Sequence, residues 1–300
     1  MVRVAVVGGI NIDTFALVDR QPTDDEPALI RAVVDGVGGK AANQAVAAAR
    51  LGASVRLLGA VGDDDDGVRA VRELEALGVD CSRVRISKTA PTGRVVGTVT
   101  AGGSKRTSAF GGANLRLAPK HVESFEDVLV GSDVVLVQLE PPADVVRTTL
   151  QLAAAADVPA LLDIAPAQGP VRELVPLARW VTGNHSEVES VTRIDVRDEG
   201  TAREAATVLR AHGPAIAGVT VGAAGQLVAW NGGESWSAVD ASDAVVDTTG
   251  AGDAFAATLA VLLAEGLSPR DAAMRASRAS TLACRRLGAQ AGLPTREELE

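Results

Sequence analysis

Short apolar segments alternate along the chain with segments in which apolar residues recur every three or four positions. The first pattern is typical of strands buried on both faces, and the second of helices that cover a sheet. The predicted strands span residues 3–7, 54–60, 133–138, 160–163, 180–182 and 215–221. The predicted helices between them span residues 40–51, 67–77, 143–156 and 201–211. This alternation predicts an α/β fold with a mostly parallel central sheet.

The last third of the chain follows a different pattern. Residues 226–230 and 234–239 flank the turn sequence Asn231-Gly232-Gly233, which predicts an antiparallel hairpin. Two helices are predicted after it, over residues 252–265 and 269–287.

Two stretches, residues 14–37 and 88–110, lack a helical period and contain segments of strict alternation, such as residues 94–100. The hypothesis is that they pair into a small second sheet. This sheet is expected to act as a lid, because both stretches leave the main sheet at the end where polar motifs gather. The alternative is an edge extension of the main sheet. Residues 1–300 are interpreted as one domain that includes these lid segments.

Composition limits the classes of function. The 300 residues are 47% hydrophobic, and 38 acidic side chains outnumber 29 basic ones, so no nucleic-acid partner is expected. The longest apolar run, residues 254–264, is about half the ~20 residues that span a bilayer, so no membrane segment is expected. Two distant cysteines and three scattered histidines favour a cytoplasmic protein without structural zinc.

The strongest chemical motif is a loop of small residues that opens directly into an apolar helix. Gly250, Ala251 and Gly252 expose backbone N–H groups that suit a phosphate in transfer. Asp253, at the end of the loop, is placed to remove a proton from an acceptor hydroxyl. The alternative is that Asp253 only caps the helix.

A second glycine-led helix start is Gly38-Gly39-Lys40-Ala41-Ala42-Asn43. Lys40 and Asn43 are three residues apart and can face neighbouring hydroxyls, which suits a polyol. The segment is not a Walker A loop, because Ala41 follows the lysine and Val34 stands where the first glycine would be. Residues 36–41 match a dinucleotide-binding pattern only loosely.

Other polar residues follow predicted strands, at the edge where ligands of open α/β sheets bind. Asn11, Asp13 and Glu140 follow two of these strands, although an Asx turn would also explain the first two. Asn184 and Glu187 could hold water-coordinated magnesium, whereas Ser186 with Glu189 equally resembles a capping box. The loop with Thr220, Gly222 and Gly225 is suited to a nucleotide.

Taken in order, these segments resemble the ribokinase-like (PfkB) family of carbohydrate kinases. The two signatures are Gly38-Gly39-Lys40 with Asn43, and Gly250-Ala251-Gly252-Asp253. The resemblance implies a Rossmann-like three-layer α/β/α sandwich with a sheet of about nine strands. It also implies a small β-sheet lid that often forms a homodimer contact.

The resemblance also implies roles for individual residues. The sugar pocket would be lined by Asn11, Asp13, Gly39, Lys40, Asn43 and Glu140. Asp253 would be the base, with Gly250, Ala251 and Gly252 as the anion hole. The nucleotide would lie along Asn184, Thr220, Gly222 and Gly225, with Glu187 supporting Mg²⁺ through water. K⁺ would lie at Asp247, Thr249, Ala283, Arg286 and Gly288.

This chain departs from the family pattern at several positions. Ala41 replaces a glycine, His185 replaces an acidic residue, and Gly292 replaces the serine that closes the potassium site. In the lid, residues 24–26 differ from the usual turn. None of these changes removes a catalytic group.

The expected reaction is transfer of the ATP γ-phosphate to a primary hydroxyl of a pentose, D-ribose first, with Mg²⁺ and K⁺ as cofactors. A nucleoside kinase of the same fold is the main alternative, but the absence of Tyr and the presence of only four Phe disfavour base stacking. A kinase for another sugar, a dehydrogenase and a non-catalytic sugar sensor are further alternatives. The intact Asp253 loop disfavours the sensor.

Overall fold

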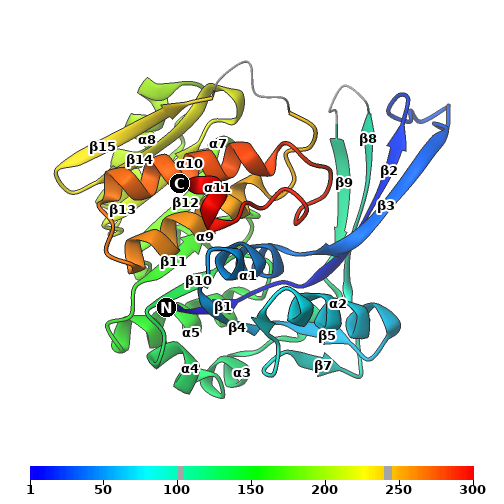
Figure 1. Cartoon of the computed structure of the whole chain (residues 1–300), viewed down its shortest axis with the longest axis horizontal. Coiled ribbons are helices and arrows are strands. Elements are labelled where there is room, and N and C mark those ends of the chain that lie inside the picture. Colours follow the sequence, from blue (N-terminus) through cyan, green and yellow to red (C-terminus); the bar gives the residue numbers. More distant parts are fainter. Residues whose placement is uncertain (101–104, 240–244) are drawn as a thin grey trace.

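The computed structural model describes residues 1–100, 105–239 and 245–300. Its centre is a nine-stranded sheet in the order β15-β14-β13-β12-β11-β10-β1-β4-β6 (Figure 1). In this sheet β6, β4, β1, β10, β11, β12 and β13 run parallel to one another. At the other edge β14 and β15 form the predicted antiparallel hairpin. The bounds are β1 Arg3–Val7, β4 Ser54–Leu58, β6 Val79–Asp80, β10 Val134–Val137, β11 Ala160–Asp163, β12 Trp180–Asn184, β13 Ile216–Thr220, β14 Gly225–Trp230 and β15 Gly233–Ala238.

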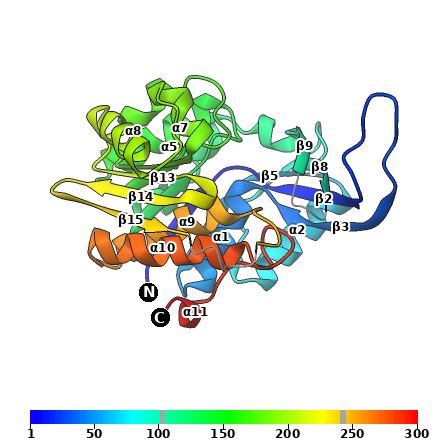
Figure 2. The ribbon, with the colours of Figure 1, turned by 90° about the horizontal axis from the view of Figure 1, so that it is seen from above.

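Helices cover both faces of this sheet and give three layers (Figure 2). One face packs against α1 Lys40–Arg50, α2 Asp65–Ala76, α9 Ala251–Ala264, α10 Pro269–Ala283 and α11 Arg296–Leu299. The other packs against α3 Pro119–Glu123, α4 Glu126–Val130, α5 Ala143–Ala155, α6 Val171–Leu174, α7 His185–Thr192 and α8 Glu199–Ala211. Along β1, Val4 and Val6 join the first core whereas Ala5 and Val7 join the second. Burial on both faces explains why the parallel strands read as continuous apolar runs.

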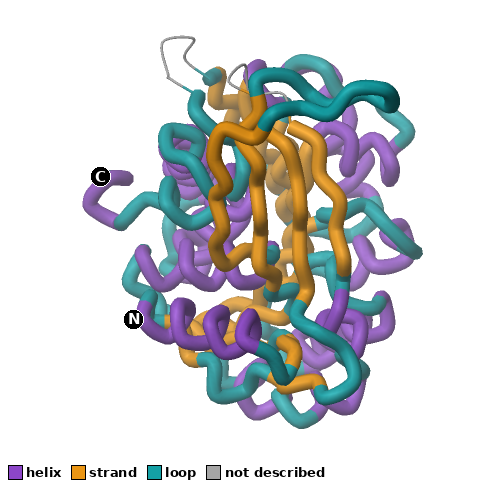
Figure 3. The backbone as a smooth tube through the Cα atoms, turned by 90° about the vertical axis from the view of Figure 1, so that its right-hand side faces the viewer, coloured by secondary structure: helices purple, strands orange, loops and turns teal. Residues whose placement is uncertain are grey.

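The two stretches without helical period form a separate four-stranded sheet, in the order β3-β2-β8-β9. Its strands are β2 Asn11–Val18, β3 Ile30–Gly38, β8 Gly93–Thr100 and β9 Lys105–Phe110, and they stand beside the main body (Figures 1 and 3). The predicted second sheet is therefore confirmed, and the edge extension is wrong. β2 begins at Asn11, so Asn11 and Asp13 lie in this sheet and not in an Asx turn. We call these four strands the lid sheet.

Two predicted elements differ from the structure. The predicted strand 54–60 is split, because the chain turns at Gly59 and continues as β5 Ala60–Gly62, which pairs with β7 Arg85–Ser87. A Cβ atom at Gly59 would lie 2.6 Å from Ile10 Cδ1, which accounts for the glycine at this bend. The last long helix ends at Ala283, four residues early, where the Cys284 carbonyl accepts N–H bonds from Val246 and Asp247.

The described residues also form three short 3₁₀ helices, η1 Gly112–Arg116, η2 Val175–Leu177 and η3 Gly222–Ala224. Both cysteines are free thiols, and Cys81 is buried. None of the helices in the described ranges combines the length and apolarity needed to cross a membrane.

Candidate active site

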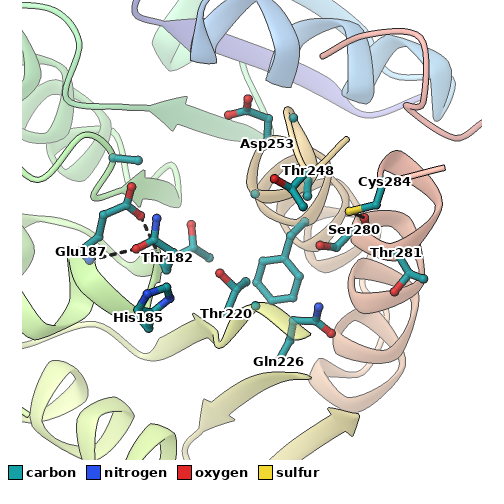
Figure 4. Close-up of a pocket in the computed structure, with 18 of the residues that line it drawn as sticks. Thr182, His185, Glu187, Thr220, Gln226, Thr248, Asp253, Ser280, Thr281 and Cys284 are labelled. Carbon is teal, nitrogen blue, oxygen red and sulfur yellow. Dashed lines mark hydrogen bonds between the residues drawn. The ribbon is translucent and has the colours of Figure 1, made fainter. Parts of the chain in front are cut away.

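A cavity of about 470 Å³ lies at the carboxyl ends of the central strands. In Figure 4 Asp253 stands at one end of it and Gln226 at the other, with Thr248, Ser280 and Cys284 along one side between them. Its walls come from β11, β12, β13, α7, α9 and α10. This is the position expected for ligands in an open α/β sheet.

Asp253 occupies the inner end of the cavity and is 5% exposed. The N-cap of α9 is Gly250, so Asp253 is in the first helical turn and the helix-cap interpretation is wrong. Asn43 Nδ2 donates to its Oδ2 at 2.8 Å, and Gln44 Nε2 donates to its Oδ1 at 3.2 Å. The carboxylate is thus held by two side chains of α1, and Asn43 is 210 residues away from it in the sequence.

The loop before Asp253 has the geometry of an anion site. Gly250 has φ +83°, and a Cβ atom there would lie 2.4 Å from the Ala289 carbonyl oxygen, so a side chain does not fit. At Gly252 a Cβ atom would meet nothing within 4 Å, so the backbone is open toward the cavity. The N–H groups of a first helical turn lack partners within the helix. Here Ala251 donates to the Thr248 carbonyl at 3.3 Å, and Gly250, Ala251 and Gly252 all line the cavity.

The start of α1 gathers the predicted sugar-pocket residues. Gly39, the N-cap, has φ +92°, and a Cβ atom there would lie 2.5 Å from the Gly9 carbonyl oxygen. Glu140 accepts the Lys40 N–H at 2.7 Å through Oε2 and the Asn11 Nδ2 amide at 3.1 Å through Oε1. The structure therefore brings Asn11, Gly39, Lys40, Asn43 and Glu140 together beside Asp253.

Asp13 lies on the lid sheet close to this group. One of its carboxylate oxygens is buried and has no hydrogen-bond partner among the described residues. Gly38 leaves room for it, since a Cβ atom there would lie 2.2 Å from Asp13 Oδ2. Burial, followed by the charge of Glu140, raises the pKa of Asp13 to about 7.

Charge in the site centres on Lys40. Burial alone lowers the pKa of its ammonium, but four carboxylates outweigh burial and raise this pKa above its usual value. In order of effect they are Asp253, Asp163, Glu187 and Glu140. Burial in turn raises the pKa of each of these carboxyl groups, and Lys40 opposes that rise. One cation therefore keeps several buried carboxylates compatible with the fold.

Sequence reasoning missed four residues of this network. Gln44 Nε2 also donates to Asp163 Oδ2 at 2.9 Å, and Gln138 Nε2 donates to Gln44 Oε1 at 2.6 Å. Asn114 holds Asn11 Oδ1 at 2.8 Å and both polar groups of the Ile10 backbone. Asp163 and Gln138 end or follow central strands, so the rule applied to Glu140 could have found them. Asn114 carries no such signal.

The outer part of the cavity is lined by Asn184, Thr220 and Gly222, as predicted for the nucleotide. Gly225 lies behind this wall, where a Cβ atom would be 2.5 Å from the Ser237 carbonyl oxygen. The dinucleotide-binding interpretation is wrong, because residues 36–38 end β3, an antiparallel strand of the lid sheet. No parallel strand leads into this glycine pair.

The predicted magnesium residues form a capping box. Asn184 Oδ1 accepts the Glu187 N–H at 3.0 Å, and Glu187 Oε2 accepts the Asn184 N–H at 2.8 Å. The box predicted from Ser186 and Glu189 is therefore wrong. Within the described ranges, no three His, Cys, Asp or Glu side chains are grouped to hold a metal directly. Glu187 lines the cavity, which fits contact with Mg²⁺ through water.

The predicted potassium residues surround the loop before α9. Asp247 Oδ1 accepts the Thr249 N–H at 2.9 Å and its hydroxyl at 2.6 Å, and Asp247 Oδ2 accepts the Gly288 N–H at 2.9 Å. Ala283 ends α10, where carbonyl oxygens lack helical donors and attract cations. A Cβ atom at Gly292 would lie 2.2 Å from the Ala283 oxygen, so this chain has no room for a serine there.

Comparisons with known proteins agree with this geometry. A family model described as pfkB family carbohydrate kinase matches residues 1–296. The chain is 34% identical over 301 residues to the ribokinase of Bacillus subtilis, covering all of this chain and 99% of that protein. It is 33% identical to the bifunctional ribokinase/ribose-5-phosphate isomerase A of Fructilactobacillus sanfranciscensis, and spans 56% of that protein's length. A structure of Arabidopsis thaliana ribokinase complexed with ribose and ATP matches with a TM-score of 0.88, at 26% identity over 99% of this chain and 97% of that one.

The buried carboxyl group of Asp13 leads to a stability prediction. Unfolded Asp13 loses its proton near pH 3.8 and folded Asp13 near pH 7, so the folded state binds more protons in this window and its stability falls as pH rises. Asp13→Asn should remove that fall. Relative to wild type, its free energy of unfolding should rise by up to about 4 kcal/mol between pH 4 and pH 8. Urea unfolding between pH 4 and 8 measures it. Asp24→Asn, at an exposed lid carboxyl, should keep the wild-type slope, and equal slopes in all three proteins would contradict the assignment.

Proposed function

Because the chain belongs to the pfkB family of carbohydrate kinases, we propose that it transfers the γ-phosphate of ATP to the primary hydroxyl of D-ribose and forms ribose 5-phosphate. It is a phosphotransferase with an alcohol group as acceptor. The observation that carries the proposal is the buried Asp253 carboxylate, held by Asn43 and Gln44 at the start of a helix that opens on the cavity. A non-catalytic sugar sensor would have no need of this base.

The chemistry follows from the position of Asp253. Its carboxylate accepts the proton of the acceptor hydroxyl while that oxygen attacks the γ-phosphorus. The bond from the γ-phosphorus to the bridging oxygen breaks, and its electron pair leaves with ADP. The amides of Gly250, Ala251 and Gly252 stabilise the charge on the transferred phosphoryl oxygens. Burial raises the pKa of Asp253, which makes the carboxylate a stronger base than an exposed one.

The acceptor is held on the side of Asp253 that faces the lid sheet. Asn11, Asp13, Asn43, Lys40 and Glu140 offer donors and acceptors spaced for the hydroxyls of a small sugar. Gly39 adds no side chain to this pocket, since a Cβ atom does not fit there. The cluster is almost entirely polar, which supports a free pentose over a nucleoside, whose base needs an apolar wall.

ATP is proposed to occupy the outer cavity along Asn184, Thr220 and Gly222, with Gly225 supporting this wall from behind. Mg²⁺ bound with the nucleotide would neutralise phosphate charge, and Glu187 would orient its water ligands. K⁺ is proposed to bind at the backbone oxygens of Asp247, Thr249, Ala283, Arg286 and Gly288. A cation there would stabilise the loop that carries the anion site.

The lid sheet is proposed to close over the acceptor and to join two copies of the chain. Its outer face exposes Val33, Val96 and Phe110, each at least half accessible to solvent. An apolar strip on a sheet face is suited to packing against a second sheet. A cytoplasmic location, where ATP is made and both thiols stay reduced, completes the proposal, and cell fractionation tests it.

The acceptor proposal is tested by ADP release with Mg²⁺ over D-ribose, 2-deoxyribose, fructose, adenosine, cytidine and pseudouridine, in KCl and in NaCl. D-ribose should give the highest kcat/KM, and KCl should support a higher rate than NaCl. Preference for a nucleoside would overturn the pentose assignment while leaving the chemistry in place. Equal rates in the two salts would contradict the potassium site.

The base is tested by Asp253→Asn. This variant should lose at least about 1,000-fold in kcat because the amide cannot take the proton, while ribose and ATP dissociation constants stay within about threefold of wild type. Quench-flow rates and calorimetric titration measure the two quantities. Asp195→Asn, at an exposed surface carboxyl, is the control and should match wild type. Turnover by Asp253→Asn at the wild-type rate would refute the mechanism.

The dimer is tested by Val96→Glu, which places a charge in the apolar strip of the lid sheet. The wild type should sediment as a dimer and the variant as a monomer, because burying an unpaired charge at an interface costs several kcal/mol. Met274→Glu changes an equally exposed side chain on α10 and should leave the dimer intact. A monomeric wild type would rule out this interface.

A further inference from the structure

Lys105 links the lid sheet to the loop that precedes Asp253. It stands at the start of β9, and its ammonium donates a hydrogen bond to Thr249 Oγ1. On the way its side chain crosses the ring of Phe15, with Nζ 4.3 Å from the ring centroid. The contact joins a strand of the lid sheet to a residue 144 positions away in the sequence.

Thr249 connects this contact to Gly250, Ala251 and Gly252, which we call the anion loop. Its hydroxyl donates to Asp247 Oδ1 at 2.6 Å, and the other oxygen of Asp247 accepts the Gly288 N–H at 2.9 Å. The residue after Thr249 is Gly250, the N-cap of α9. Gly250 has no side chain to fix its own conformation, so the groups that hold Thr249 contribute to the orientation of the following amides, beside the bonds from Ala254 N–H to Gly250 O and from Ala251 N–H to Thr248 O.

The surroundings of Lys105 fit a permanent contact better than a solvated surface lysine. Its side chain is partly buried, and burial lowers the pKa of its ammonium while Asp247 and Asp13 oppose that effect. Holding a cation in this position costs desolvation free energy, which the Thr249 hydroxyl, the Phe15 ring and the two carboxylates offset. Asp13 belongs to the acceptor side and Asp247 to the loop, so Lys105 lies between the two.

We propose that Lys105 is a positioning residue that couples closure of the lid sheet over the acceptor to the geometry of the anion loop. The coupling rests on the proposed kinase function. When the lid sheet lies over the site, the ammonium fixes Thr249 and thereby the amides that receive the phosphoryl group. When the lid sheet moves away, Thr249 loses this donor. The phosphoryl site is then complete only when the acceptor site is covered.

Lys105→Met, which keeps the length of the side chain and removes the charge, tests the coupling. Its kcat/KM for D-ribose should fall about tenfold, the effect of losing one charge-assisted hydrogen bond, while KM for ATP changes less than about twofold. Lys105→Arg should recover part of the loss. Arg106→Met removes a charge from the adjacent, exposed position of the same strand and should match wild type.

A double-mutant cycle separates coupling from general damage. If Lys105 acts through Thr249, then Lys105→Met/Thr249→Val should be no slower than the slower single variant. The proposal would be overturned if the losses in kcat/KM of the two single variants multiplied in the double variant. It would also be overturned if Lys105→Met and Arg106→Met had the same kcat/KM.

Amide hydrogen exchange provides a readout that does not depend on turnover. Lys105→Met should speed exchange both in residues 105–110 and in the first turn of α9, whereas Arg106→Met should change neither. Faster exchange in the lid sheet alone would overturn the coupling. If the wild type fails to phosphorylate ribose, the proposed acceptor is wrong. The hydrogen-exchange comparison of Lys105→Met with Arg106→Met still decides whether Lys105 joins the lid sheet to the anion loop.

Discussion

The charge balance around Lys40 is the constraint on which the rest of the site depends. Four carboxyl groups share this region, and burial pushes each of them toward its neutral form. A neutral Asp253 could not accept a proton, so in the proposed mechanism the ammonium both stabilises the cluster and keeps the proposed base ionised. The amides of Asn43 and Gln44 complete the arrangement, because they donate to the ionised carboxylate. The stability of the fold and the proposed catalysis thus both require the positive charge of Lys40.

The topology explains how these groups meet. Parallel strands all end at one edge of the sheet, so residues that follow β1, β10, β11 and β12 converge although the sequence separates them widely. Helices α1 and α9 lie side by side on one face and begin at this edge (Figure 1). Both helices bury several alanines in this core, such as Ala45 and Ala257, and these small side chains let the two helices approach closely. Their first turns can therefore share a hydrogen bond between Asn43 and Asp253.

Much of the fold follows from local pattern, whereas much of the site does not. The strand ends, the loop at Gly250 and the glycine pair at Gly38 could be predicted because periodicity and backbone chemistry are local properties. The exact start of β2 could not, since the register of the lid sheet is set by pairing with distant strands. Asn114 was missed for a related reason, because its partners lie about 100 residues away. The cap of α7 was misplaced by two residues, an error at the usual scale for helix ends.

The candidate acceptor residues and the candidate base lie in different parts of the molecule, and this has a consequence for ATP hydrolysis. Asp13 and Asn11 belong to the lid sheet, whereas Asp253 and the anion loop belong to the body. Water can occupy the space of an acceptor hydroxyl, but it is too small to touch both parts at once and draw them together. A pentose in the proposed pocket would contact both. On the proposed mechanism the enzyme would therefore discriminate against water, its most abundant competing nucleophile, by size, and ATP would be protected from hydrolysis while no sugar is present.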